Sequence, residues 1–299
     1  MRIIVTGATG TIGMSLLSKL TRNNYDVTVI ANKDSSRNER LSIFENITIV
    51  EASLSDYSSI ELEGKYDIFI HMAWNGGKNR NNVEANFNSA IASSVAVELA
   101  AKYNCQIFLS TGSQAEYGIK FEQIFEGTEC EPDTPFGVAK LSSMWLTRNE
   151  CKKHNIRHIW LRVFSVYGPY DGEQTMIMQT IRNVLNDDIP RFTSGNQLWD
   201  FIHSDDIADA IVKLILNKSC SGIYLIGSGN KLRLKDYLEM ISNQLNFNLE
   251  QSIGKYAVVS SNERNLWVNC NRLQNDTGWN PKIKFSDGIR MLINFIKSR

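Results

Sequence analysis

Hydrophobic residues in the first 165 positions fall into two alternating patterns. Short apolar runs bounded by turn-forming residues predict buried strands, and longer segments with apolar residues three or four positions apart predict helices. Strands that alternate with helices predict a doubly wound parallel sheet of the α/β class, whose ligands bind at the carboxyl ends of the strands. The expected strands are residues 3–5, 26–30, 47–50, 66–72, 106–110 and 158–162, and long helices are expected at 84–103 and at 136–154.

The pattern is less regular after residue 168. We expect one further strand at 223–226 and helices at 204–216, 234–245 and 286–297. Residues 1–165, together with about 201–227, are therefore expected to form the larger domain. Residues 166–200 and 228–299 are expected to form a smaller C-terminal α/β domain.

Three glycines at a spacing of three residues separate the first expected strand from the first expected helix. Gly7, Gly10 and Gly13 allow the backbone to approach a pyrophosphate closely. The first N–H groups of the following helix, at Thr11 and Ile12, point toward such an anion. This context predicts that residues 1–165 form a Rossmann dinucleotide-binding domain, which leaves the smaller domain to bind a substrate.

Composition and charge argue against several classes of protein. The 32 basic and 32 acidic residues cancel, and no basic tail or stripe favours nucleic-acid binding. No apolar stretch has the length of a membrane span, and Met1-Arg2 leads directly into the first strand instead of a signal peptide. The five scattered cysteines lack a C-x-x-C pair and the four histidines lack H-E-x-x-H spacing, so we expect free thiols, no metal site and a cytoplasmic location.

The loop after the second strand indicates which dinucleotide binds. Sites for NAD usually place a carboxylate there for the ribose 2′-hydroxyl, and Ala31 stands in its place. Asn32, Lys33 and Arg37 follow, and cationic side chains favour the 2′-phosphate of NADP(H). The alternative is that Asp34 contacts the ribose while Lys33 and Arg37 are solvated loop charges.

Hydroxyl, tyrosine and lysine residues gather in the segments that follow the later strands. Ser113 precedes Tyr117-Gly118, Lys140 lies in Pro135-x-Gly137-x-x-Lys140, and Tyr167-Gly168-Pro169 follows Leu161-Arg162. With the glycine turn, Asp200-Phe201-Ile202-His203-Ser204-Asp205-Asp206 and Gly278-Trp279-Asn280-Pro281, the chain resembles the extended short-chain dehydrogenases/reductases that act on nucleotide sugars, the NAD-dependent epimerase/dehydratase family, over nearly its whole length.

The resemblance implies a catalytic set of Ser or Thr, Tyr and Lys. In the family the Tyr hydroxyl exchanges a proton with the sugar oxygen, and the Lys lowers the pKa of that Tyr and holds the nicotinamide ribose. Ser113 and Lys140 match two of these positions, but Phe136 stands at the Tyr position and cannot carry a proton. Three explanations are open: a deliberate Tyr→Phe change, a natural enzyme that takes its proton from Ser113, another residue or water, or a non-catalytic NADP-binding protein.

The reaction follows from the resemblance and the expected cofactor. Dehydratases of the family have an acidic pair after the hydroxyl residue, where this chain has Gln114 and Ala115, so dehydration is not expected. An NADPH preference fits a reductase better than an epimerase, which recycles a tightly held NAD. We therefore expect reduction at C4 of a nucleotide-linked 4-keto-6-deoxy sugar in deoxysugar or O-antigen biosynthesis, with an NAD-dependent nucleotide-sugar epimerase as the alternative.

Further site residues are expected from the same resemblance. Trp199 stands where the family commonly has a basic residue for the pyrophosphate, a role that Arg191 or Arg264 could take over. The family commonly forms homodimers through two helices, which here correspond to 84–103 and 136–154. The cofactor is expected to contact His71, Ala73, Lys140 and Phe164 as well as the glycine turn, and the nucleotide sugar is expected to contact Trp74, Gln114, Ser165, Arg191, Trp199 and Arg264.

Overall fold

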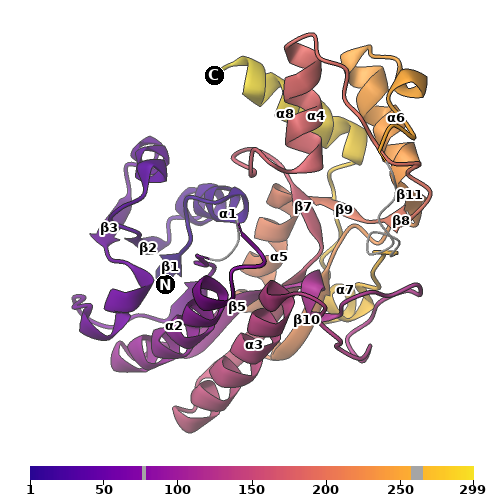
Figure 1. Ribbon diagram of the computed structural model, residues 1–299. Helices are drawn as coiled ribbons and strands as arrows, with labels where there is room; N and C mark the ends of the chain where they lie inside the picture. Colours follow the sequence, from indigo (N-terminus) through magenta and orange to yellow (C-terminus); the bar gives the residue numbers. More distant parts are fainter. Residues whose placement is uncertain (76–78, 257–264) are drawn as a thin grey trace.

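A single seven-stranded sheet forms the centre of the larger part of the molecule (Figure 1). The computed structural model describes residues 1–75, 79–256 and 265–299. All seven strands are parallel, in the order β10-β6-β5-β4-β1-β2-β3, so the predicted doubly wound sheet is confirmed. The strands are β1 (Arg2–Thr6), β2 (Asp26–Ala31), β3 (Ile47–Glu51), β4 (Ile68–His71), β5 (Ile107–Ser113), β6 (Arg157–Val163) and β10 (Gly222–Ile226).

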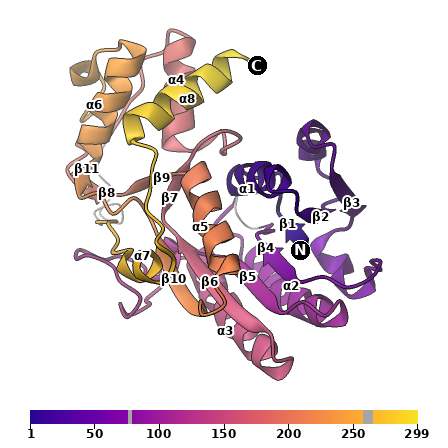
Figure 2. The same ribbon diagram turned by 180° about the vertical axis from the view of Figure 1, so that it is seen from behind.

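Helices cover both faces of this sheet (Figures 1 and 2). On one face lie α2 (Val83–Lys102) and α3 (Pro135–Lys153), and on the other lie α1 (Thr11–Arg22) and α5 (Ser204–Leu216). Because successive strand residues point to opposite faces, Ile3 and Val5 pack on the α1 side while Ile4 packs on the α2 side. The continuous apolar runs of the sequence are therefore strands buried on both faces.

A smaller helical part lies beyond the carboxyl ends of the strands. Its three long helices are α4 (Met176–Leu185), α6 (Leu234–Leu245) and α8 (Phe285–Lys297), which share a core that includes Ile181, Ile241 and Leu292. The division into two domains stays a prediction. Leu273 and Trp279 were expected in the smaller domain, but they pack into the core of the larger part. The other elements in the described part of the chain are β7 (Ser165–Tyr167), β8 (Leu198–Trp199), β9 (Phe201–His203), β11 (Leu232–Arg233), α7 (Asn271–Thr277) and the short 3₁₀ helices η1 (Ser36–Ile43), η2 (Leu54–Ser59), η3 (Gln114–Glu116) and η4 (Leu249–Gln251).

The order of the strands reverses between β1 and β4. At such a reversal the two loops leave the sheet in opposite directions and open a crevice at its carboxyl edge. The Thr6 hydroxyl bridges the two strand ends, because it accepts hydrogen bonds from the backbone N–H groups of Met72 at 3.2 Å and Ala73 at 3.3 Å. The start of the predicted cofactor site is therefore held in place by β1 and β4 together.

The sequence predicts free cysteines, no metal site and no membrane-spanning helix. Within residues 1–75, 79–256 and 265–299, no group of three or more His, Cys, Asp or Glu side chains could hold a metal ion. No helix in these ranges is sufficiently long and apolar to cross a membrane. All five cysteines carry free thiols.

Candidate active site

A cavity of about 560 Å³ opens at the glycine turn, between the loops that follow β2 and β4. Five of the predicted cofactor residues line it: Gly7, Gly10, Asn32, Arg37 and Ala73. Such a volume lies in the usual range for small-molecule and cofactor sites. Its other polar or aromatic lining residues are Thr9, Asp34, Ser35, Ser36, Tyr57, Trp74 and Asn75, and Gly172 reaches it from the segment before α4.

The three glycines of the turn differ in what surrounds them. Gly7 has a φ of +71°, and a Cβ there would lie 2.5 Å from the Met72 carbonyl carbon. A Cβ on Gly13 would lie 2.5 Å from the carbonyl oxygens of Gly7 and Ala8, so both glycines are required by the fold itself. A Cβ on Gly10 would meet only the Gly7 oxygen, at 3.5 Å.

The start of α1 completes this turn. Gly10 is the N-cap residue, and Thr11, Ile12 and Gly13 form the first helical turn. Their N–H groups have no partner within the helix, as at any helix start. The residues present therefore fit the phosphates of a dinucleotide.

Charges of both signs lie in the loop after β2. Arg37 and Asp34 both line the cavity. Lys33 does not line it; its Nζ lies 3.4 Å from Asp56 Oδ2, and the Lys33 side chain is half exposed. The geometry thus keeps Arg37 and Asp34 as candidates for the ribose end of the cofactor and weakens the case for Lys33.

Arg40, which was not among the predicted site residues, also lies in this region. Its Nη1 donates a hydrogen bond to the Thr9 carbonyl oxygen at 2.8 Å, and burial lowers its pKa. Arg40 therefore holds the η1 helix against the glycine turn. A basic residue inside a polar 3₁₀ segment carries no signal in the sequence that would have identified this role.

His71 is a buried member of β4 with partners at both ring nitrogens. Nδ1 lies 2.8 Å from the Thr6 hydroxyl and Nε2 lies 3.0 Å from the Ser93 hydroxyl. Burial, with a smaller effect from the Lys140 charge, lowers the pKa of His71 to about 3. A neutral His71 therefore supports Thr6 beneath the glycine turn, and the structure shows no ring nitrogen left for a cofactor.

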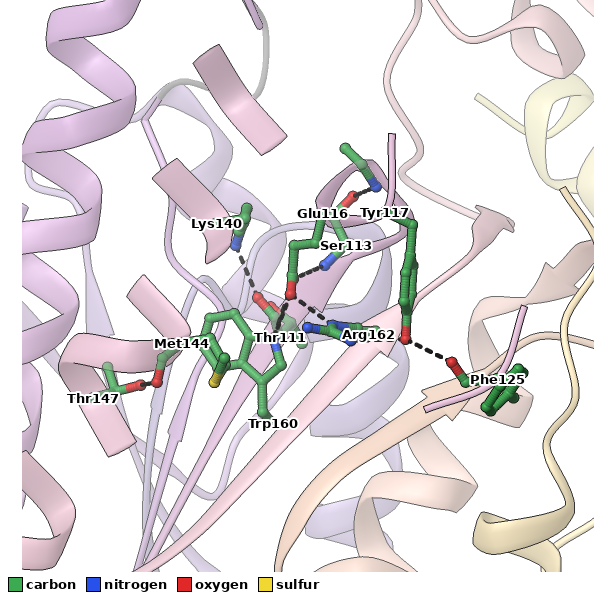
Figure 3. Close-up of polar contacts among 11 residues, drawn as sticks. Thr111, Ser113, Glu116, Tyr117, Phe125, Lys140, Met144, Thr147, Trp160 and Arg162 are labelled. Atoms are coloured by element: carbon green, nitrogen blue, oxygen red, sulfur yellow. Dashed lines mark hydrogen bonds and ion pairs between the residues drawn. The ribbon is translucent and has the colours of Figure 1, made fainter. Parts of the chain in front are cut away.

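Two of the predicted catalytic residues, Ser113 at the end of β5 and Lys140 on α3, are seen in Figure 3, and Phe136 lies four residues before Lys140 on the same helix. Ser113 is the last residue of β5. The Lys140 ammonium donates a hydrogen bond to the Thr111 carbonyl oxygen at 2.8 Å, and its Nζ lies 5.9 Å from the Phe136 ring centroid. Burial lowers the pKa of Lys140 to about 7, against an opposing effect of the Glu116 charge. Burial therefore makes the Lys140 amine a weaker base than that of an exposed lysine.

Phe136 lies in a fully formed aromatic site. Its ring makes an edge contact with the Trp74 indole, with centroids 6.0 Å apart. The Trp74 Nε1 donates to Asn86 Oδ1 at 2.9 Å, and the Lys140 Nζ lies 3.8 Å from the Trp74 ring centroid. Phe136 is thus buried between Trp74 and Lys140, at the position where the resemblance to the family predicts a tyrosine.

The predicted substrate residues are only partly brought together. Gln114 and Ser165 lie beside this centre, since the Ser165 hydroxyl donates to Gln114 Oε1 at 3.4 Å. Phe164, expected at the cofactor, is buried in the core and its N–H donates to the Ile226 oxygen at 3.0 Å. The Trp74 side chain covers Lys140.

Two other predicted substrate residues, Arg191 and Trp199, do not line the cofactor cavity. Arg191 lines separate hollows beside Asn183 and Tyr256, which share no residue with the cofactor cavity. Trp199 packs against Phe201, with ring centroids 6.3 Å apart, and its Nε1 has no hydrogen-bond partner among the described residues. Arg264 lies outside the residues that the structure describes.

Comparison with known proteins identifies the family. A family model described as "NAD dependent epimerase/dehydratase family" matches residues 3–227. The chain belongs to this family. It is an α/β protein with a Rossmann-like sheet, from a family of enzymes that modify nucleotide sugars.

Individual members of the family are only distantly similar. CDP-abequose synthase from Salmonella typhimurium is 26% identical, with 97% of both chains covered, and dTDP-4-dehydro-6-deoxyglucose reductase from Escherichia coli is 25% identical, with 99% of this chain and 98% of the relative covered. A solved UDP-N-acetylglucosamine 4-epimerase from Methanobrevibacter ruminantium superposes with a TM-score of 0.89 at 23% identity, over 99% of this chain and 98% of the other. The solved epimerase shares the fold of this chain, and the three proteins differ in their named reactions.

Proposed function

We propose that the protein is a nucleotide-sugar ketoreductase that uses NADPH to reduce the C4 ketone of a 4-keto-6-deoxy sugar. One observation carries this proposal: Lys140 is anchored to β5 two residues before Ser113, and its ammonium contacts the ring of Trp74, which lines the cofactor cavity. Gln114 accepts a hydrogen bond from Ser165, and Ala115 has no acidic group, so neither can move protons as a dehydratase requires.

The side chains at the site would divide the work as follows. Bound NADPH would supply the hydride for the carbonyl carbon, and the carbonyl oxygen, which would gain the electron pair of the C=O bond, would need a proton. Ser113 would donate a hydrogen bond to this oxygen, and Lys140 would hold the ribose beside it. Phe136 has no proton to give, so in this chain the proton would come from water and turnover would be slow.

A direct assay tests this function. The probes are dTDP-4-dehydro-6-deoxyglucose, the sugar named for one relative, and its CDP counterpart. The chain is expected to oxidise one NADPH for each sugar reduced. The alternative is an NAD-dependent epimerase, in which Asp34, a lining residue of the cavity, would accept a hydrogen bond from the ribose of NAD. An epimerase would interconvert sugars with no net NADPH consumption.

The cofactor preference rests on Arg37. We expect NADPH to bind more tightly than NADH, and Arg37→Ala to weaken NADPH binding about 10- to 100-fold while leaving NADH binding unchanged, because a charge-assisted phosphate contact is lost. Lys33→Ala is the matched control and should have a smaller effect, since Lys33 already faces Asp56. Fluorescence titration gives the dissociation constants of NADPH and NADH for the unaltered chain and for each variant. Equal affinity of the unaltered chain for the two cofactors would contradict this assignment.

We further propose a homodimer formed through α2 and α3. These helices pack side by side, and their outer face exposes large apolar side chains, as a protein interface does. Phe87 and Ile91 lie four residues apart on α2, and Trp145 is 51% exposed on α3.

The dimer can be tested by one charge on this face. Ile91→Asp is expected to convert dimers to monomers in sedimentation experiments at micromolar concentration, because it buries an unpaired charge in the interface. Ile43→Asp is the control, since Ile43 is similarly exposed, at 63%, but lies on η1. A monomeric parent chain would contradict the proposal.

A further inference from the structure

A carboxylate is buried directly beneath Ser113. Glu116 is fully buried, and its Oε1 accepts a hydrogen bond from the Ser113 N–H at 2.7 Å. Its Oε2 accepts from Arg162 Nε at 2.6 Å, and the indole Nε1 of Trp160 donates to Oε1 at 3.1 Å (Figure 3). Three donors from two strands therefore fix this single side chain.

The strand leaves space for this carboxylate. A Cβ on Gly112 would lie 2.4 Å from Glu116 Oε1 and 2.2 Å from Trp160 Nε1. Burial is the largest single influence on the pKa of Arg162 and lowers it, but the charge and hydrogen bond of Glu116, together with Tyr117 and Cys130, raise the pKa overall. A buried ion pair often adds little stability compared with apolar side chains of the same volume. The Glu116–Arg162 pair lies beside the end of β5, which indicates that it positions Ser113.

The η3 helix determines where the Ser113 hydroxyl can point. Ser113 and Glu116 form a capping box, in which the Ser113 Oγ accepts from the N–H of Glu116 as well as from Ala115 at 3.2 Å. These two bonds occupy both lone pairs of Oγ. The remaining direction is that of the O–H bond, so Ser113 is held as a hydrogen-bond donor that points away from η3.

The same unit is fixed to the helix that carries Lys140. A Cβ on Gly137 would lie 2.3 Å from the Ala115 carbonyl oxygen, which shows how closely η3 approaches the first turn of α3. A shift of Glu116 would consequently move Ser113 relative to Lys140.

We propose that Glu116 is a positioning residue that aims the Ser113 hydroxyl at the carbonyl oxygen of the substrate, with Arg162 as its counter-ion. This inference rests on the proposed ketoreductase function. Aspartate at this position would keep the charge that Arg162 needs. It is one methylene shorter, however, and would not span Ser113 N and Arg162 Nε together.

A double-mutant cycle tests whether Glu116 acts through Ser113. In the Phe136→Tyr chain, Glu116→Asp is expected to lower kcat about tenfold with KM changed less than about threefold. In a chain that also carries Ser113→Ala, the same substitution should lower kcat less than about twofold, because the hydroxyl it positions is absent. Equal losses in both backgrounds would overturn the proposal.

Tyr117→Phe provides a matched control at the opposite side of the ion pair. It removes the 2.7 Å hydrogen bond from Arg162 Nη1 to the Tyr117 oxygen and leaves the Ser113 contact intact. We expect a lower melting temperature with kcat within about twofold. A loss of kcat as large as that of Glu116→Asp, at an equal loss in melting temperature, would mean that the ion pair is only structural.

Hydrogen exchange separates failure of this inference from failure of the proposed function. Glu116→Asp should accelerate exchange of the Ser113 amide at least tenfold, and Tyr117→Phe should not, whether or not any sugar is reduced. Faster exchange without turnover in any chain would refute the ketoreductase and retain the positioning of Ser113. Unchanged exchange in Glu116→Asp would refute the positioning itself.

Discussion

Phe136→Tyr is expected to raise kcat for NADPH-dependent reduction of dTDP-4-dehydro-6-deoxyglucose or its CDP counterpart by about 10²- to 10⁴-fold. This is the usual contribution of a positioned general acid. The ring already lies in a buried aromatic site, 5.9 Å from the Lys140 ammonium, so a hydroxyl would be added to a prepared position. A nearby cation lowers the pKa of a phenol, which suits it to proton transfer at neutral pH.

Lys140→Met provides the control for this gain. Combined with Phe136→Tyr, it should remove most of the increase, because the added phenol would lose its activating charge. Steady-state NADPH oxidation measures all four chains. If Phe136→Tyr gives no increase, the missing hydroxyl does not limit this protein, and the explanations based on water or another donor gain support.

Gly10→Ala is expected to weaken NADPH binding by at least about tenfold while leaving the melting temperature nearly unchanged. The added methyl group meets only the Gly7 oxygen at an ordinary 3.5 Å, so the fold can accept it. It nevertheless occupies the surface over which a pyrophosphate would approach the backbone. Calorimetric titration with NADPH and a thermal melt give the two quantities.

Gly13→Ala has the opposite character and serves as the comparison. Its methyl group would lie 2.5 Å from two carbonyl oxygens, so a large loss of stability is expected, of several kcal/mol. If Gly10→Ala binds NADPH as tightly as the parent chain, the glycine turn does not hold the pyrophosphate. If Gly13→Ala melts with the parent, the packing described for the start of α1 is wrong.

The central sheet could be predicted because its strands are short apolar runs buried on both faces. In the run Ile3-Ile4-Val5, Ile3 and Val5 pack into the core on one face of the sheet and Ile4 packs into the core on the other face. The long helix α3 was also recognisable, since Pro135 is its first residue and Thr134 accepts a hydrogen bond from the Gly137 N–H. Apolar runs and helix-start residues involve only a few neighbouring positions, so they can be recognised in the sequence.

Other features depend on contacts between distant segments. The strands β8 and β11 have two residues each and pair only because the later chain folds back. The partners of His71 come from β1 and α2, so its burial could not be read from its neighbours in the sequence. The pairing of Lys33 with Asp56 was hidden for the same reason.

The contacts of Glu116 with Ser113 and Arg162 were predictable only in part. The spacing of Ser113 and Glu116 is a capping-box pattern that a reader of the sequence could have recognised. The pairing of Glu116 with Arg162 joins η3 to β6, however, and only the fold reveals it. The candidate site was therefore predictable in its motifs and not in the contacts that orient them.

Transfer of deuterium from NADPH is the measurement that tests the proposed reaction most directly. The Phe136→Tyr chain would be incubated with dTDP-4-dehydro-6-deoxyglucose, or its CDP counterpart, and NADPH carrying deuterium at the transferable position of C4. The proposed reaction gives a reduced sugar nucleotide that is one mass unit heavier than the unlabelled product, with the label at C4 of the sugar. A product without deuterium, or an epimerised sugar formed with no loss of NADPH, would contradict it.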